Sequence, residues 1–278
     1  MRPPLLGLLF AVSVPLVAQW PDYPIARIPR TADGKPDLQA PAPRTTDGRP
    51  DFSGVWRFVD SPDARNGPPL PAGVGTAGIG QRVRGLNQFF DIGSTLKDGL
   101  PFQPWAAELR QKRAADNNKD NPDAHCLPLG LMQLHTHPEP RKIIQAPGVI
   151  VILYEANGGI RQIFTDGRPL PSEDAQPWWY GYSTGRWEGD TLVVETNGFR
   201  DDVWLDVEGS PMTAAARMIE RFRRVNFGNM EIEVTVDDPK AYTKPWTVLI
   251  HHRIMLNTEL IEFVCQENEK DVAHSVGK

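Results

Sequence analysis

The sequence predicts a mainly β protein, an antiparallel meander that closes into a barrel or a barrel-like sandwich. From about residue 143 to 266, turn signals such as Asn157-Gly158 and Gly189-Asp190 separate β-rich runs, as is typical of hairpins. In the run 230–236 apolar and polar residues alternate strictly, which indicates one buried and one exposed face. A long meander usually closes, because open sheet edges invite aggregation.

Each expected element can be placed by its residue range. The expected strands are 53–58, 149–154, 160–164, 180–187, 191–196, 218–225, 230–236, 246–256 and 260–266. One short helix is expected at 104–113, because a proline stands at its start and basic residues fall in its last turn, where each is favoured. We expect the β-rich part, 53–278, to form a single domain.

Residues 1–18 have the features of a signal peptide. A short basic start precedes an apolar stretch from Leu5 to Ala18; at about 14 residues it has the length of a signal-peptide core and is too short to span a membrane. We expect cleavage after Ala18, with an uncleaved anchor as the alternative. The mature protein would then be periplasmic or secreted, without a transmembrane segment.

Cysteine content and charge restrict the compartment and the partners. Cys126 and Cys265 are the only cysteines, and in an exported chain two cysteines most simply form one disulfide; two free buried thiols are the alternative. The net charge of −5 argues against a nucleic-acid partner, which calls for a basic patch. Glu220 interrupts the arginines of 217–224, so a salt-bridged sheet face is expected there.

The N-terminal region, 19–52, is expected to be an extended, proline-rich strap. The segment 30–38 recurs as 44–52, with a shorter echo at 165–169. Each copy has Asp-Gly, a basic residue and Pro, which is a tight-turn signature, and the copies are too few for a solenoid. Residues 60–103 are rich in Gly and Pro and are expected to form a long loop or flap.

Several motifs carry a resemblance to known families. Gly54 and Trp56, on the expected first strand, resemble the opening of lipocalin-like barrels, in which the tryptophan closes one end. Four longer segments are similar to a family of exported, uncharacterised bacterial proteins: 47–56, 126–130, 185–196 and 237–246. This second resemblance covers most of the mature chain. It implies export, and it carries no activity or site residue.

Our leading functional hypothesis is a small apolar or aromatic ligand held inside the barrel. Aromatic residues crowd into 178–187, with Trp204 beyond, and such rings stack on sugars, apolar ligands or one another. The expected lining residues are Tyr182, Trp187, Trp246 and His252. On a strand, His252 shares a face with Trp246. Core packing of these aromatics is the alternative, and no cofactor is expected.

A secreted hydrolase or lyase, including one that acts on saccharides, is the second hypothesis. The candidate acid–base residues are His252, Glu188 and Asp190, since glycosidases use carboxylates about 5–9 Å apart. Residues 181–185 match the G-x-S-x-G pattern. A hairpin is expected after them where a nucleophile elbow needs a helix, so we do not expect Ser183 to be a nucleophile.

A metal site is the third hypothesis. His135, His137 and Glu139 resemble the metal loop of cupins, in which His-x-His and Glu bind a divalent metal. Glu139 follows too closely for that pattern, and a third histidine is missing unless His251 or His252 supplies it. We therefore expect a proline-rich surface loop and no metal. A metal-binding cupin-like protein and a structural envelope protein are the remaining alternatives.

Overall fold

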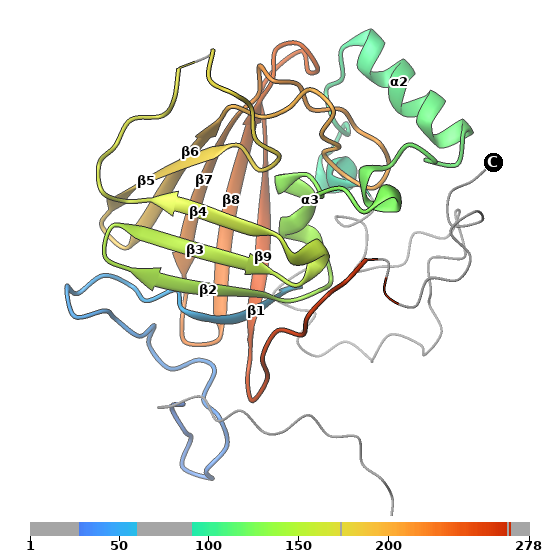
Figure 1. The fold of residues 1–278 in the computed structure, drawn as a ribbon. Coiled ribbons are helices and arrows are strands. Elements are labelled where there is room, and N and C mark those ends of the chain that lie inside the picture. The colour runs from blue at the N-terminus through green and yellow to red at the C-terminus, as the bar shows by residue number, and fades with distance from the viewer. Residues whose placement is uncertain (1–27, 60–90, 173, 266, 268–278) are drawn as a thin grey trace, which may run out of the picture.

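The strands form one closed barrel. The structure, a computed structural model, describes residues 28–59, 91–172, 174–265 and 267 (Figure 1). Within this part of the chain each strand pairs with its neighbours in sequence, and the first strand closes onto the last. The predicted fold class is therefore confirmed. The expected signal peptide and residues 60–90 of the expected flap lie outside the described residues.

The elements follow the predicted ranges closely. The strands are β1 (Gly54–Val59), β2 (Arg141–Ala146), β3 (Val149–Tyr154), β4 (Ile160–Phe164), β5 (Tyr182–Glu188), β6 (Thr191–Asn197), β7 (Arg217–Arg224), β8 (Asn229–Asp237) and β9 (Trp246–Met255). The helices are η2 (Ile92–Thr95), α2 (Pro104–Ala115), η3 (Pro122–His125), α3 (Leu131–Thr136) and η4 (Ala156–Gly158). The predicted helix at 104–113 corresponds to α2.

Three details differ from the sequence-based expectation. β4 and β5 pair in parallel, because the connection 165–181 returns the chain to the end where β4 began. β2 is an additional strand whose inward residues Arg141 and Gln145 are polar, so it lacks the apolar alternation of a typical strand. The described part of the expected strand 260–266, residues 260–265, is instead an irregular segment outside the barrel ladder.

Alternation along each strand separates the inside of the barrel from the outside. On β9, Trp246, Val248, Ile250 and His252 are buried, and the residues between them are more exposed. The outer face carries ion pairs such as Arg221–Glu188, at 3.0 Å. The predicted salt-bridged sheet face is therefore present.

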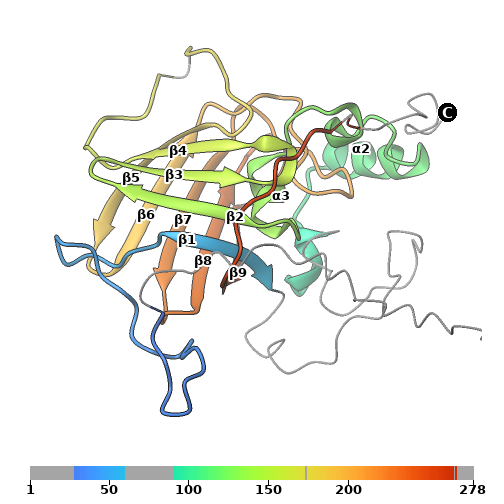
Figure 2. The same ribbon diagram turned by 60° about the horizontal axis from the view of Figure 1, so that its bottom comes forward.

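The segment before β1 closes one end of the barrel. Phe52 is 1% exposed and stacks on Trp187, with 5.5 Å between the ring centroids. The indole nitrogen of Trp56 donates to the Phe52 carbonyl at 2.9 Å. The Arg224 guanidinium lies over the Trp56 ring at 4.9 Å and donates to the carbonyl of Asp51. Figure 2 shows this blue segment running beneath the barrel.

The sequence repeats in this segment are two copies of one turn. Gly34 and Gly48 both have φ of +81°, a left-handed conformation that glycine adopts without strain. The second copy is anchored to the barrel, because Arg44 pairs with Asp190 of the β5–β6 hairpin at 2.6 Å. The interpretation of these repeats as turns is confirmed.

Helices and loops cover the opposite end. All six residues of α3 are buried, so this short helix plugs the barrel beneath α2 (Figure 1). The predicted disulfide joins Cys126, directly after η3, to Cys265. Among the described residues, no helix is long and apolar enough to cross a membrane.

Candidate functional site

Polar and charged side chains gather at the centre of the barrel and at a pocket beside α2, among other places. At the centre, Nη1 of Arg161 on β4 donates to Oε1 of Glu220 on β7 at 2.9 Å, and its Nη2 donates to Oε2. His135 on α3 reaches the same carboxylate, with 2.6 Å between Nε2 and Oε1. Because each of the three residues is at most 2% exposed, this is a buried ionic cluster.

The walls of the barrel complete the hydrogen bonds of this cluster. Nε of Arg161 donates to the hydroxyl of Ser183 at 3.1 Å, and Nη2 donates to the hydroxyl of Thr196 at 3.1 Å. Ser183 is the serine of the G-x-S-x-G pattern, and it lies in the strand β5, which leads into the β5–β6 hairpin. It therefore has a structural role and does not form a nucleophile elbow.

A second buried guanidinium joins α3 to β9. Nη1 of Arg141 donates to the His135 carbonyl at 2.8 Å and lies 2.8 Å from Nε2 of His252, which is itself 2.9 Å from that carbonyl. Its Nη2 donates to the carbonyls of His137 and Glu139 at 2.8 and 3.2 Å. Arg141 therefore holds the chain that leaves α3 against the barrel wall.

Burial and charge set the protonation of the cluster. Burial alone would raise the pKa of Glu220, but Arg161 and the hydrogen bond from His135 lower it to about 2. Burial lowers the pKa of His135 more than Glu220 raises it. Burial, with the Arg141 charge, holds the pKa of His252 well below its usual value. The carboxylate is thus ionised and both imidazoles are neutral at pH 7.

The expected lining residues occupy different parts of the barrel. Trp187, Trp246 and His252 face inward, but Trp187 packs at the Phe52 end, and Trp246 lies at the other end, 5.7 Å from the ring of Tyr242. Tyr182 alternates with the inward Ser183. It therefore lies on the outer wall, and its ring stacks on Phe164 at 5.2 Å. The structure does not bring these four residues into one site.

The expected acid–base residues are also separated. Glu188 and Asp190 lie on the outside of the β5–β6 hairpin, where they pair with Arg221 and Arg44. His252 is buried inside the barrel.

The cupin-like residues are divided in the same way. His137 pairs with Glu139 where the chain leaves α3, and His135 turns inward to Glu220. Within the described ranges, no group of three or more His, Cys, Asp or Glu side chains could hold a metal ion.

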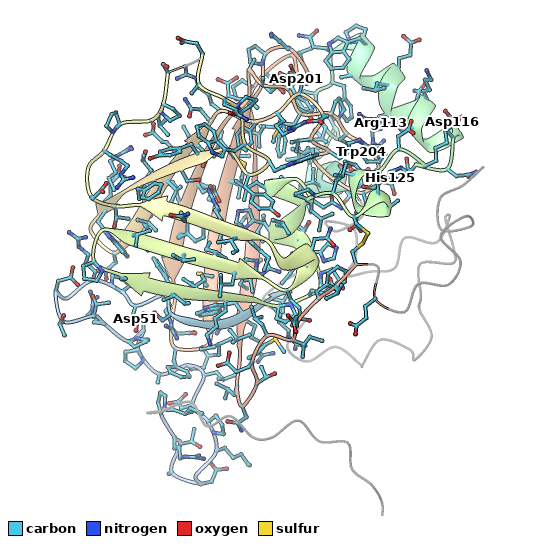
Figure 3. The ribbon with its side chains drawn as sticks, in the orientation of Figure 1. Asp51, Arg113, Asp116, His125, Asp201 and Trp204 are labelled. Atoms are coloured by element: carbon cyan, nitrogen blue, oxygen red, sulfur yellow. A yellow bond between two sulfur atoms is a disulfide. The ribbon has the colours of Figure 1, made fainter. Side chains whose placement is uncertain are left out.

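A pocket of about 310 Å³ lies between α2, η3 and the loops that precede β5 and follow β6 (Figure 3). This volume falls in the range of small-molecule sites. It is lined by Leu109, Lys112, Arg113, Asp116, Asp120, Pro122, His125, Leu127, Trp179, Asp202 and Trp204. Aromatic, aliphatic and charged side chains thus meet around one concave surface.

Arginines hold the two tryptophans of the pocket in place. The Arg113 guanidinium lies over the Trp204 ring at 4.4 Å, and its Nη1 donates to the Gly209 carbonyl at 2.7 Å. Arg200 lies over Trp179 at 4.5 Å. Such cation–π contacts fix the orientation of the rings.

The rim of the pocket carries charges of both signs. Asp116, Asp120 and Asp202 line the pocket together with Lys112 and Arg113. Arg200 binds both carboxylate oxygens of Asp202 at 2.8 Å. The other two aspartates are exposed, and Asp116 lies 4.0 Å from the ammonium group of Lys119.

Sequence reasoning noted Trp204 but missed the α2 side of the pocket. A helix face that carries both basic and acidic residues, such as Lys112 and Asp116, is usually exposed to solvent. Nothing local indicates that this helix lies against the loop after β6, because the two are far apart in the sequence. Arg113 and Gly209, which are hydrogen-bonded, are 96 positions apart.

Comparison with known proteins adds no assignment. No family model matches the chain, and no curated protein matches it.

Proposed function

We propose that this chain is an exported β-barrel protein that binds a small polar molecule, of the saccharide class, in the pocket beside α2. The observation that carries the proposal is the pocket itself, in which the half-buried Trp179 and a charged rim surround about 310 Å³. The Cys126–Cys265 disulfide supports export, because such bonds persist in oxidising compartments.

The pocket is a better candidate than the interior of the barrel. An apolar ligand inside would displace or contact the Arg161–Glu220 pair, and desolvated charges cost free energy unless they remain paired. The pocket beside α2 requires no such rearrangement. The proposed binding site is therefore the pocket at this end of the barrel and not the interior, and the proposed ligand is polar and not apolar.

The lining favours a saccharide over a strongly charged ligand. Tryptophan faces stack on sugar rings, and carboxylates and cations on one rim suit a molecule with many hydroxyl groups, which both donate and accept hydrogen bonds. An anion would meet Asp116 and Asp120, and a cation would meet Lys112 and Arg113. A neutral polar ring avoids both repulsions.

Titration calorimetry of the oxidised mature protein tests the proposal. The panel is glucose, N-acetylglucosamine and cellobiose, with palmitate and indole as apolar ligands. Trp179→Ala is expected to weaken saccharide binding at least about tenfold, as loss of an aromatic anchor does. Trp178→Ala is the matched control, because Trp178 is exposed and packs on Tyr182 outside the pocket; it should bind normally. Binding of the apolar ligands alone, or of none, would overturn the proposal.

Hydrolysis of a saccharide in the same pocket is the second candidate. The observation that favours it is the set of carboxylates at the rim, because glycosidases use carboxylate pairs. Release of nitrophenol from p-nitrophenyl glycosides measures this activity. Asp120→Asn is expected to abolish turnover while leaving binding measurable. Saccharide binding without turnover would show a binding protein and exclude the enzyme.

A further inference from the structure

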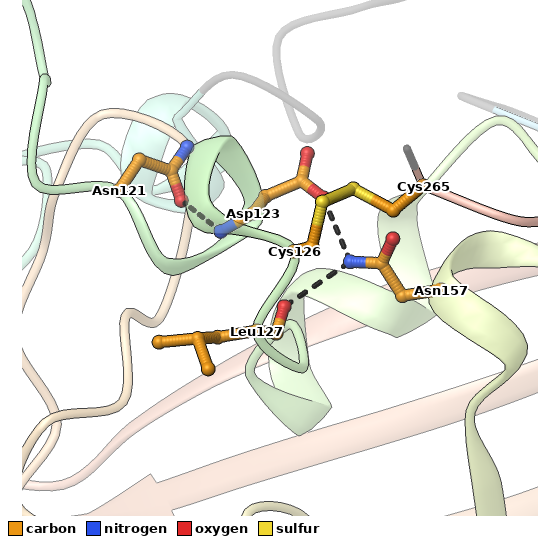
Figure 4. The surroundings of a disulfide bond; sticks show 6 residues. All are labelled: Asn121, Asp123, Cys126, Leu127, Asn157 and Cys265. Carbon is orange, nitrogen blue, oxygen red and sulfur yellow. Dashed lines mark hydrogen bonds between the residues drawn. A yellow bond between two sulfur atoms is a disulfide. The ribbon is translucent and has the colours of Figure 1, made fainter. Parts of the chain in front are cut away.

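The disulfide lies directly behind one wall of the pocket. Pro122, His125 and Leu127 line the pocket. Cys126 stands between the last two, and its side chain is bonded to Cys265 (Figure 4). A change at this bond therefore acts on residues that are adjacent to pocket-lining side chains.

Cys126 has a backbone conformation that must be held in place. Its φ of +57° lies in the left-handed region, which is unfavourable for residues other than glycine. In this conformation its N–H donates to the Asp123 carbonyl at 3.0 Å, and the N–H of Leu127 donates to the Pro122 carbonyl at 2.9 Å. These two bonds close η3 and set the direction of Leu127.

Hydrogen bonds from one side chain also tie η3 and Leu127 to η4. The side-chain amide of Asn157, in η4, donates to the Asp123 carboxylate at 2.7 Å and to the Leu127 carbonyl at 3.2 Å (Figure 4). The disulfide is the covalent connection at the same place, and it joins η3 to the segment that follows β9.

Beyond Leu256, which packs against the core, the chain after β9 is weakly packed apart from this bond. Glu259 pairs with Lys142 at 2.5 Å, and the N–H of Ile261 donates to the Glu155 carboxylate at 2.9 Å. Exposed ion pairs of this kind contribute little to stability. The apolar side chains of Ile261, Phe263 and Val264 are between 42% and 55% exposed, so little buried area holds the segment in place.

We propose that the Cys126–Cys265 disulfide is a redox latch for the pocket: its reduction frees residues 256–265, loosens η3 and weakens ligand binding, while the barrel stays folded. The effect on binding rests on the proposed function, whereas the loosening of η3 does not. The reductant is a dithiol. The S–S bond breaks, each cysteine sulfur gains one electron and one proton, and the dithiol closes to its own cyclic disulfide.

The barrel is expected to survive reduction, because neither cysteine belongs to a strand. The ladder closes through β1 and β9, whose five paired positions run from Val55–Met255 to Val59–His251. Hydrogen-bonded strands are the most protected part of such a fold, and segments with few buried contacts open first.

Hydrogen exchange of the oxidised and dithiothreitol-treated protein tests the latch without a ligand. Thiol titration confirms that reduction is complete. We expect exchange at 121–127 and 256–265 to rise at least about tenfold on reduction, with the strands unchanged, and the Cys126→Ser/Cys265→Ser variant to behave like the reduced protein. Unchanged exchange at 121–127 would overturn the latch.

Glu259→Gln provides the matched control. It removes another anchor of the same segment and leaves both sulfurs bonded. We expect faster exchange around residue 259 and no change at 121–127. If this variant loosened 121–127 as much as reduction does, the disulfide would have no special role, and the proposal would fail.

Binding of cellobiose and N-acetylglucosamine to the oxidised and reduced forms completes the experiment. The latch predicts at least about tenfold weaker binding after reduction. Equal affinity in both forms would refute control of the pocket by the disulfide. If neither form bound while exchange at 121–127 still rose, the proposed function would fail and the latch on η3 would stand.

Discussion

The centre of the barrel and the pocket beside α2 contain the same kinds of side chain in opposite surroundings. At the centre, Arg161, Glu220 and His135 are buried and satisfy one another. Around the pocket, Asp116, Asp120 and Lys112 are exposed to solvent. A buried charge must be paired, and pairing leaves no group for a ligand. The comparison teaches that charge inside this barrel is paired within the fold, whereas charge at its α2 end remains exposed to solvent.

The largest expected effect is at the buried pair. Glu220→Gln leaves the Arg161 guanidinium buried without a counter-ion, and we expect a loss of about 3–5 kcal/mol in the free energy of unfolding. Urea denaturation measures it. Glu233→Gln, on the exposed face of the neighbouring strand, should stay within about 0.5 kcal/mol of the parent. Equal effects of both substitutions would show that the buried cluster contributes no more to the free energy of unfolding than an exposed charge does.

Acid should also lower the stability of the fold through the buried cluster. His135 and His252 have lowered pKa values in the fold, so below pH 6.5 only the unfolded chain takes up their protons and stability falls. The pKa of Glu220 is lowered to about 2, so a further loss of stability follows as the pH falls from 4.5 toward 2. Asp206 opposes this trend between about 6 and 3.8, because burial raises its pKa to about 6.

Urea midpoints measured between pH 7 and 3 check this balance. They should decrease below pH 6.5, and Asp206→Asn should make the decrease steeper. A midpoint that is constant down to pH 4 would contradict neutral buried histidines.

The next largest effect on stability is expected at the end of the barrel that Phe52 closes. Phe52→Ala removes the ring that stacks on Trp187 and closes the barrel, and we expect a loss of about 3 kcal/mol in unfolding free energy. Phe263→Ala is the matched control, because Phe263 is 42% exposed; it should change stability little. A small effect of Phe52→Ala would mean that the segment before β1 covers the barrel without supporting it.

The smallest effect is expected at an exposed ion pair of the same segment. Arg44 and Asp190 are joined by two hydrogen bonds, at 2.9 and 2.6 Å, but exposed pairs rarely contribute measurably. Arg44→Gln should therefore leave the urea midpoint unchanged at physiological salt. A clear decrease would show that this end of the barrel depends on charge as the centre does.

Local patterns in the sequence determined much of the fold. The alternation along 230–236 and the glycines at the hairpin turns predicted strands and turns that the structure contains, because these signals depend on neighbouring residues. The pairing of Cys126 with Cys265 followed from their number and from the signs of export. Such inferences need no knowledge of how distant parts of the chain meet.

Only the tertiary structure decided which charged residues lie together. Glu220 is 59 positions from Arg161 and 85 from His135, and in sequence it reads as one more charge on a polar strand face. The pocket likewise joins α2 to the loop after β6 at Trp204. Closure of the barrel brings these residues together, because the pairing between strands determines which side chains point into the interior at the same level. Local periodicity in the sequence carries no information on this pairing.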